Sequence, residues 1–114
     1  MYINSDVEIT PDGYFYQEHF LDDEAAFKFT VSVDSVSDIF QSEFVPPEKL
    51  AARNSLAELN GNRSPNWWDP SSRSLVGGDF TVPPPNAPGN RGLCIGIAGN
   101  QDGTYTVYVR WFET

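Results

Sequence analysis

Two adjacent indoles, Trp67 and Trp68, are the side chains of this sequence best suited to binding chemistry. They lie in a stretch rich in Ser, Asn, Arg and Pro, where two neighbouring rings cannot both easily point into a core. Paired aromatic rings in loops stack on sugars, bases or partner side chains, and Trp is enriched at interface hot spots. The alternative is that both rings pin a long loop onto the fold, with Asp69 and Pro70 shaping the turn. We therefore treat Trp67 and Trp68 as candidate binding residues.

A second candidate site is the acidic run Asp22, Asp23 and Glu24. Three carboxylates in a row could hold a hard cation, but a calcium loop needs ligands at spaced positions and a Gly for its turn. The run has neither feature, so the sequence predicts no metal site. Asp22, Asp23 and Glu24 remain candidate contacts for a basic partner, and the alternative is a solvated turn.

Catalytic chemistry has little support in the sequence. His19 is the one histidine, which excludes a two-histidine relay, and no nucleophile elbow or oxyanion loop accompanies it. Cys94 lies between Leu93 and Ile95 in an apolar stretch, with no neighbour that would lower its pKa. We expect His19 and Cys94 to be ordinary strand residues. The sequence predicts no catalytic residue and no cofactor, and it favours a non-enzymatic protein.

The charge is sorted by position along the chain. Residues 1–48 hold eleven Asp and Glu against one Lys, whereas residues 49–114 are nearly balanced, and the net charge is −9. On the expected strands, Asp6, Glu8 and Asp34 fall on the outward side. An acidic surface of this kind attracts a basic protein in a salt-dependent way, and it repels phosphate backbones and anionic lipids. We expect a basic partner, no direct nucleic-acid binding and no membrane; the alternative role of the charge is solubility.

Length and composition predict one domain, residues 1–114, with a core of its own. Hydrophobic residues make up 39% of the chain, including eight Phe, five Tyr and three Trp, so disorder is not expected. The single Cys excludes an intrachain disulfide, and the start of the chain has no secretory pattern. No apolar run approaches the roughly 18 residues of a membrane span. The expected setting is reducing and cytoplasmic.

Alternation of apolar and polar residues predicts the strands that would position the candidate residues. Strands are predicted at 3–9, 27–34 and 75–82, and a C-terminal hairpin pairs 93–98 with 105–111 around the loop 99–103. Pro11-Asp12-Gly13 predicts a turn that joins the strand over 3–9 to the aromatic run from Tyr14 to Phe20 in a β-hairpin. Gly77-Gly78 indicates a bulge or a close backbone approach. Small residues at 94, 96 and 98 leave room on one sheet face for a helix or an aromatic ring.

One helix interrupts this β pattern. Pro46-Pro47 followed by Glu48, with Asn60-Gly61 as a stop, predicts a principal helix over about residues 47–60. Its inward face would carry Ala52, Leu56 and Leu59. A short helical turn capped by Asp34 or Ser35 is expected before it. The predicted fold is α+β, a mostly antiparallel sheet of five or six strands with one helix and a C-terminal hairpin. The alternative is an all-β barrel or sandwich.

These observations favour a protein-interaction module over an enzyme. The acidic half and the tryptophan loop predict an inhibitor, an immunity-type protein or an acidic mimic that binds a basic partner. The alternative is a binder of a carbohydrate or another planar or apolar molecule through the Trp67–Trp68 loop, with Tyr14 and Tyr16 as further platforms.

Overall fold

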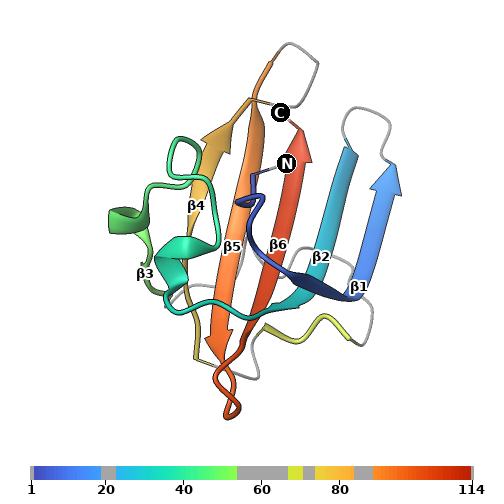
Figure 1. Cartoon of the computed structure of the whole chain (residues 1–114). Helices are drawn as coiled ribbons and strands as arrows, with labels where there is room; N and C mark the ends of the chain where they lie inside the picture. The colour runs from blue at the N-terminus through green and yellow to red at the C-terminus, as the bar shows by residue number, and fades with distance from the viewer. Residues whose placement is uncertain (1, 19–22, 54–66, 71–73, 84–88, 114) are drawn as a thin grey trace.

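The computed structural model describes residues 2–18, 23–53, 67–70, 74–83 and 89–113. These residues form one six-stranded antiparallel sheet in the order β1-β2-β6-β5-β4-β3 (Figure 1). The strands are β1 (Ile9–Glu18), β2 (Asp23–Val31), β3 (Ala51–Ala52), β4 (Val76–Val82), β5 (Arg91–Gly99) and β6 (Tyr105–Glu113). The last strand of the chain, β6, lies between β2 and β5, so the C-terminal hairpin forms the centre of the sheet.

The β5–β6 hairpin was predicted from alternation alone, and the structure confirms it. The two strands pair in continuous register from Arg91 opposite Glu113 to Gly99 opposite Tyr105. The reversal is closed by a hydrogen bond of 2.8 Å from the Asn100 N–H to the Thr104 carbonyl. Gly103 adopts a φ of +88°, a left-handed conformation that side chains other than glycine rarely take. The register of the two strands and the residues of the turn therefore both favour a hairpin.

One face of the sheet carries the main core, and we call it the front face. Every second residue of the central strands faces it: Phe29 and Val31 of β2, Leu93, Ile95 and Ile97 of β5, and Val107, Val109 and Trp111 of β6. Two irregular segments lie across this face in Figure 1, and we call them together the cover, residues 2–8 and 32–50. Tyr2, Ile39, Phe40 and Val45 of the cover are buried against the sheet.

The opposite face, the back face, carries a smaller cluster. Its strand residues are Ala26, Cys94, Ala98 and Tyr108, and Trp68 and Leu75 pack on them. The small side chains of β5 leave space for the Trp68 indole, whose ring meets the Tyr108 ring edge-on at 5.3 Å between centroids. Of the two occupants predicted for this space, a helix or an aromatic ring, the structure shows the aromatic ring of Trp68. Because both faces are covered, β5 is buried almost along its length.

The predicted helix over residues 47–60 is wrong. Pro47–Lys49 forms a single 3₁₀ turn, η2, after which Leu50 is extended and Ala51 and Ala52 pair with β4 as strand β3. Ala52 is exposed, and residues 54–60 lie outside the described part of the chain. The Pro-Pro-Glu start signal suits one turn of 3₁₀ helix as well as an α-helix, and backbone pairing at the edge of β4 outweighs a weak helical preference.

The fold class is therefore all-β and not α+β. Among the described residues the helical elements are η1 (Val36–Asp38) and η2, each of three residues. The alternative of an all-β fold has the correct class, and its described form is a sheet with β1 and β3 at the edges. The predicted helical turn is η1, and Ser35 caps it by accepting a hydrogen bond from the Ser37 N–H.

The N-terminal strand prediction also needs correction. Ile3 forms one isolated bridge to Phe40, and the strand β1 begins only at Ile9. The expected turn at Pro11-Asp12-Gly13 is instead an irregularity inside β1, where the register against β2 shifts between Pro11 and Gly13. Proline and a bulge are both typical of an edge strand, which needs no hydrogen bonds on its outer side.

The strand predicted over 75–82 is confirmed as β4. It pairs with β5 in continuous register, so the two glycines mark a close approach and not a bulge. A Cβ atom placed on Gly77 would lie 1.9 Å from the Ile95 carbonyl oxygen, and no side chain can be accommodated there.

Candidate functional site

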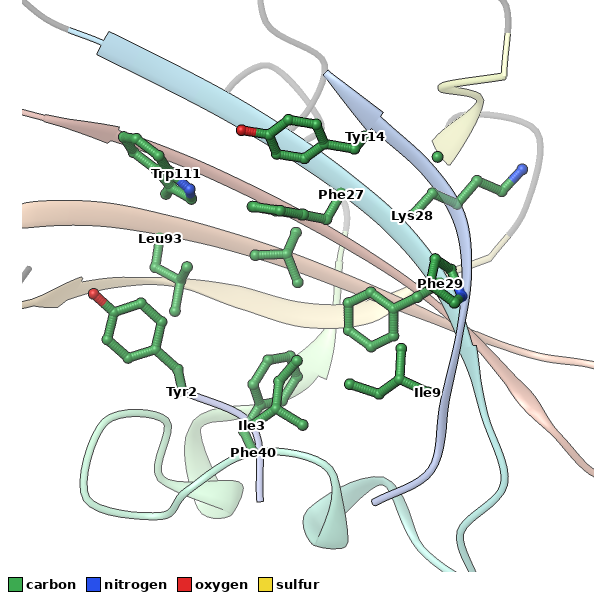
Figure 2. Close-up of a pocket in the computed structure, with 13 residues that line it drawn as sticks. Tyr2, Ile3, Ile9, Tyr14, Phe27, Lys28, Phe29, Phe40, Leu93 and Trp111 are labelled. Atoms are coloured by element: carbon green, nitrogen blue, oxygen red, sulfur yellow. The ribbon is translucent and has the colours of Figure 1, made fainter. Parts of the chain in front are cut away.

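A pocket of about 390 Å³ lies on the front face, between the cover and the β1–β2 side of the sheet (Figure 2). Its lining comes from the cover and from four strands: Tyr2, Ile3, Ile9, Pro11, Gly13, Tyr14, Phe27, Lys28, Phe29, Phe40, Leu93, Val109 and Trp111. The side chains that line it are almost all aliphatic or aromatic. The pocket can therefore hold an apolar group.

The register irregularity in β1 decides which side chain stands at the mouth. Without it, strict alternation from Ile9 would place Gly13 on the front face. With it, Tyr14 lies opposite Phe27, and their rings stack in a tilted arrangement with 4.8 Å between centroids. The local sequence Pro-Asp-Gly thus builds one wall of the pocket.

The cover forms the opposite wall and is held by backbone and side-chain contacts. The Gln41 N–H donates to the Tyr2 carbonyl at 2.7 Å, and Ile3 bridges to Phe40. The Tyr2 hydroxyl donates to the Pro83 carbonyl at 2.8 Å, while its ring meets Phe44 edge-on at 5.2 Å. These contacts fix Tyr2 and Phe40 against the sheet.

The mouth of the pocket exposes large apolar side chains. Tyr14 is 60% exposed and Ile9 is 41% exposed, although both are strand residues. Exposed apolar side chains at the rim of a cavity are typical of binding surfaces. This arrangement is the feature of the described residues that most resembles a ligand site.

The polar atoms of two lining residues, Tyr2 and Lys28, are hydrogen-bonded to residues outside the lining. The Lys28 amine points away from the pocket in Figure 2 and donates to the Trp67 carbonyl at 3.2 Å and to the Asp69 carboxylate at 3.0 Å. The Tyr2 hydroxyl is bound to Pro83. Trp111 carries the Arg91 guanidinium stacked on its ring at 3.8 Å. The interior of the pocket therefore presents mainly carbon atoms.

A polar network on the back face ties the tryptophan loop to the sheet. The Asp69 carboxylate accepts from the Lys28 amine and, at 2.7 Å, from the Tyr108 hydroxyl. Partial burial raises the pKa of Asp69, but the hydrogen bonds from Tyr108 and Lys28 outweigh it, and the net pKa is lowered. Asp69 is thus held in its charged form as a loop anchor.

The candidate residues Trp67 and Trp68 lie on this anchored loop. Trp68 is 7% exposed and packs on Tyr108, while the Trp67 ring lies directly over Gly13, where an added Cβ would be 2.6 Å from it. The two rings meet edge-on at 6.1 Å. This geometry supports the interpretation that the rings pin the loop, and Trp68 faces away from the pocket.

The acidic run is not brought together as a site by the described residues. Asp22 lies outside them, and Asp23 begins β2 opposite Glu18 of β1. The Glu24 carboxylate pairs with Arg110, whose guanidinium lies 5.4 Å from the Phe112 ring. Glu24 therefore serves an ion pair of the back face.

Of the two nucleophile or base candidates, Cys94 does not line the pocket. His19 lies outside the described residues. Cys94 is buried in β5, where desolvation and the nearby Asp79 carboxylate raise the pKa of its thiol to about 12. At neutral pH the thiol is protonated and unreactive. Within the described ranges no cluster of His, Cys, Asp and Glu has the composition of a metal site.

Most pocket residues were missed by sequence reasoning, with Tyr14 the exception because it was named as a platform. Phe27, Leu93 and Trp111 were recognised only as strand residues. Their meeting depends on β6 lying between β2 and β5, a non-local pairing that alternation does not encode. The local signal for Tyr14 was the aromatic run Tyr14-Phe15-Tyr16.

The chain finds no match among protein family models, curated proteins or solved structures. Of the helical segments in the described ranges, none is long and apolar enough to cross a membrane.

Proposed function

We propose that this chain is a non-enzymatic binding protein whose front-face pocket receives an apolar group. The observation that carries the proposal is the pocket itself: about 390 Å³, lined by carbon-rich side chains, with the exposed Tyr14 and Ile9 at its mouth. A cavity of this kind is the usual starting hypothesis for a binding site.

The chemistry of the lining defines the class of group that suits it. Burial of apolar surface contributes about 25 cal/mol per Å², so a ring or branched aliphatic group gains several kcal/mol on entry. A carbohydrate would lose hydrogen bonds to water that this lining does not replace. The pocket thus favours an apolar group over a sugar, and it lies on the face opposite Trp68.

A titration with Nile red, a neutral apolar dye, tests this proposal. We expect the dye to gain fluorescence on wild-type protein and to bind at least about fivefold more weakly to Ile9→Trp, which fills the mouth of the pocket. The matched control is Val76→Trp, because Val76 is a front-face strand residue, 37% exposed, that does not line the pocket. Equal binding by Ile9→Trp and wild type, or no binding at all, would reject the pocket as a site.

A second function, binding of a basic protein, is favoured by the charge of the cover. Six acidic residues of the cover are exposed: Asp6, Glu8, Asp34, Asp38, Glu43 and Glu48. Ion pairs among the described residues are made by other acids, namely Glu24, Asp69 and Asp79. Capture from native lysate at low salt and at about 0.5 M salt tests this function, since a basic partner should be lost at high salt.

A further inference from the structure

The lining of the pocket limits what its occupant can be. Pockets for free small molecules span about 300–1,000 Å³ and carry a few polar groups that orient the ligand. This pocket is at the small end, about 390 Å³, and its Tyr2 and Lys28 polar atoms are engaged elsewhere. Shape and apolar contact are the means of selection inside it. Further selectivity must come from groups outside the pocket.

The groups outside the pocket are acidic. Glu8 directly precedes Ile9 at the mouth, and Asp38 lies two residues before Phe40 of the lining; both are exposed. The Asn4 amide holds the two segments side by side by donating to the Asp38 carbonyl at 2.8 Å and to the Phe40 carbonyl at 3.1 Å. Acids from separate parts of the chain thus lie on the layer that walls the pocket.

Lys49, the exposed cation of the cover, follows Glu48 in η2 and does not line the pocket. Two other cations lie at the pocket wall, and neither cancels the negative charge at the surface. Lys28 is paired with Asp69 on the back face. Arg91 is 8% exposed and is stacked on the Trp111 ring. The exposed charge beside the mouth is therefore negative.

We propose that the pocket receives a single apolar side chain from a basic segment of a protein partner, while Lys or Arg side chains flanking that residue contact the acids of the cover. The proposal rests on the proposed function and names its occupant. It joins an apolar anchor in a desolvated pocket with a charged rim, the arrangement found at binding hot spots. The rim raises the association rate and is screened by salt, whereas the anchor sets the dissociation rate.

Synthetic peptides distinguish an apolar side chain in a basic segment from the other possible occupants, which are a segment that is not basic and a free small molecule. The first peptide has one phenylalanine centred among eight lysines; the second replaces the phenylalanine by alanine; the third replaces the lysines by glutamates. N-acetyl-phenylalanine amide represents a free small ligand. Binding is followed by NMR shifts of ¹⁵N- and methyl-labelled protein at Ile9, Phe27 and Val109, which line the pocket.

We expect the first peptide to shift these resonances and to bind at least about tenfold more tightly than either altered peptide or the free amide. Its affinity should fall as salt is raised from about 0.05 to 0.5 M. Equal binding of the glutamate peptide, equal binding of the free amide, or an absence of shifts at the pocket would each overturn the proposal. If Nile red binds while the peptides are not discriminated, the pocket is a site for a small apolar ligand and only this inference fails.

Variants that neutralise the acids beside the mouth, Glu8 and Asp38, test their contribution without filling the pocket. The double variant Glu8→Gln with Asp38→Asn should bind the first peptide about threefold or more weakly than wild type does. The affinity of this variant for the peptide should also depend less on salt. The control is Asp102→Asn, on the β5–β6 loop, whose side chain accepts from Thr104 and can still do so as Asn. The control removes one charge and the double variant two, so the losses are compared per neutralised charge. An equal loss per neutralised charge would mean that net charge alone, and not this surface, attracts the peptide.

Discussion

Asp69 is the residue that couples the tryptophan loop to the centre of the sheet. Its carboxylate accepts hydrogen bonds from Lys28 of β2 and Tyr108 of β6, two neighbouring strands. Because Trp68 packs on that same Tyr108, loss of the carboxylate should loosen the whole back-face cluster.

Replacing Asp69 by Ala should therefore lower the free energy of unfolding by about 1–2 kcal/mol, since two hydrogen bonds are lost and one buried hydroxyl is left without its acceptor. The measurement is urea denaturation followed by tryptophan fluorescence. Asp38→Ala is the matched control, because Asp38 is exposed and its carboxylate makes no described hydrogen bond. Equal stability of the two variants would show that Asp69 does not anchor the loop.

The lowered pKa of Asp69 gives this anchor a pH dependence. A carboxyl with a lower pKa in the folded chain contributes stability above its unfolded value, near 3.8, and loses it as pH falls through the folded value. The stability difference between wild type and Asp69→Asn should be full at pH 7 and shrink below about pH 4. Urea curves at pH 7 and pH 2.5 measure it. A difference that is constant with pH would contradict the predicted protonation.

At the scale of the element, the pairing of β4 with β5 depends on a residue without a side chain. Gly77→Ala places a Cβ 1.9 Å from the Ile95 carbonyl oxygen, and because the obstacle is backbone it cannot swing away. We expect a loss of roughly 3 kcal/mol or an unfolded chain. The control is Gly99→Ala in β5, where the nearest atom lies 3.9 Å from the new Cβ. Comparable melting temperatures for the two variants would disprove the close approach.

The elements that sequence reasoning found are those whose information is local. The β5–β6 hairpin combines alternation on both arms with a Gly-containing reversal, and the pairing of its two arms lies within one short stretch. The helix over 47–60 failed because its start signals describe only one turn, while the pairing of Ala51 and Ala52 with β4 depends on a strand much later in the chain. Pro11-Asp12-Gly13 carries turn residues, but it sits inside an edge strand that tolerates a bulge.

The candidate site could be predicted only in part for the same reason. Tyr14 was named as a platform, together with Tyr16, because both belong to the aromatic run Tyr14-Phe15-Tyr16, which is visible in the sequence. Its neighbours Phe27, Leu93 and Trp111 come from three strands that the chain order does not place together. The tryptophan pair was visible but ambiguous, because the same residue types serve as anchors and as contacts.

At the scale of the whole molecule, negative charge is concentrated on one layer. The exposed acids of the cover repel one another, and the net charge of the chain is −9. Raising salt from about 0.01 to 0.3 M should screen this repulsion and raise the melting temperature by about 2–4 °C, which corresponds to roughly half a kcal/mol at this size. The gain should be smaller in the Glu8→Gln with Asp38→Asn variant. The melting temperatures are measured by differential scanning calorimetry. A melting temperature that falls as salt is raised would contradict the prediction.

The front-face pocket is the centre of this interpretation, and toluene is the simplest probe of it. The measurement is a methyl NMR titration of the wild-type protein with toluene. Saturable shifts should appear at Ile9, Leu93 and Val109, which line the pocket, and not at Val76 or Ile97, which belong to the same face outside it. Saturable shifts at the three pocket residues alone would establish an apolar site. Shifts spread evenly over the face, or none at all, would contradict it.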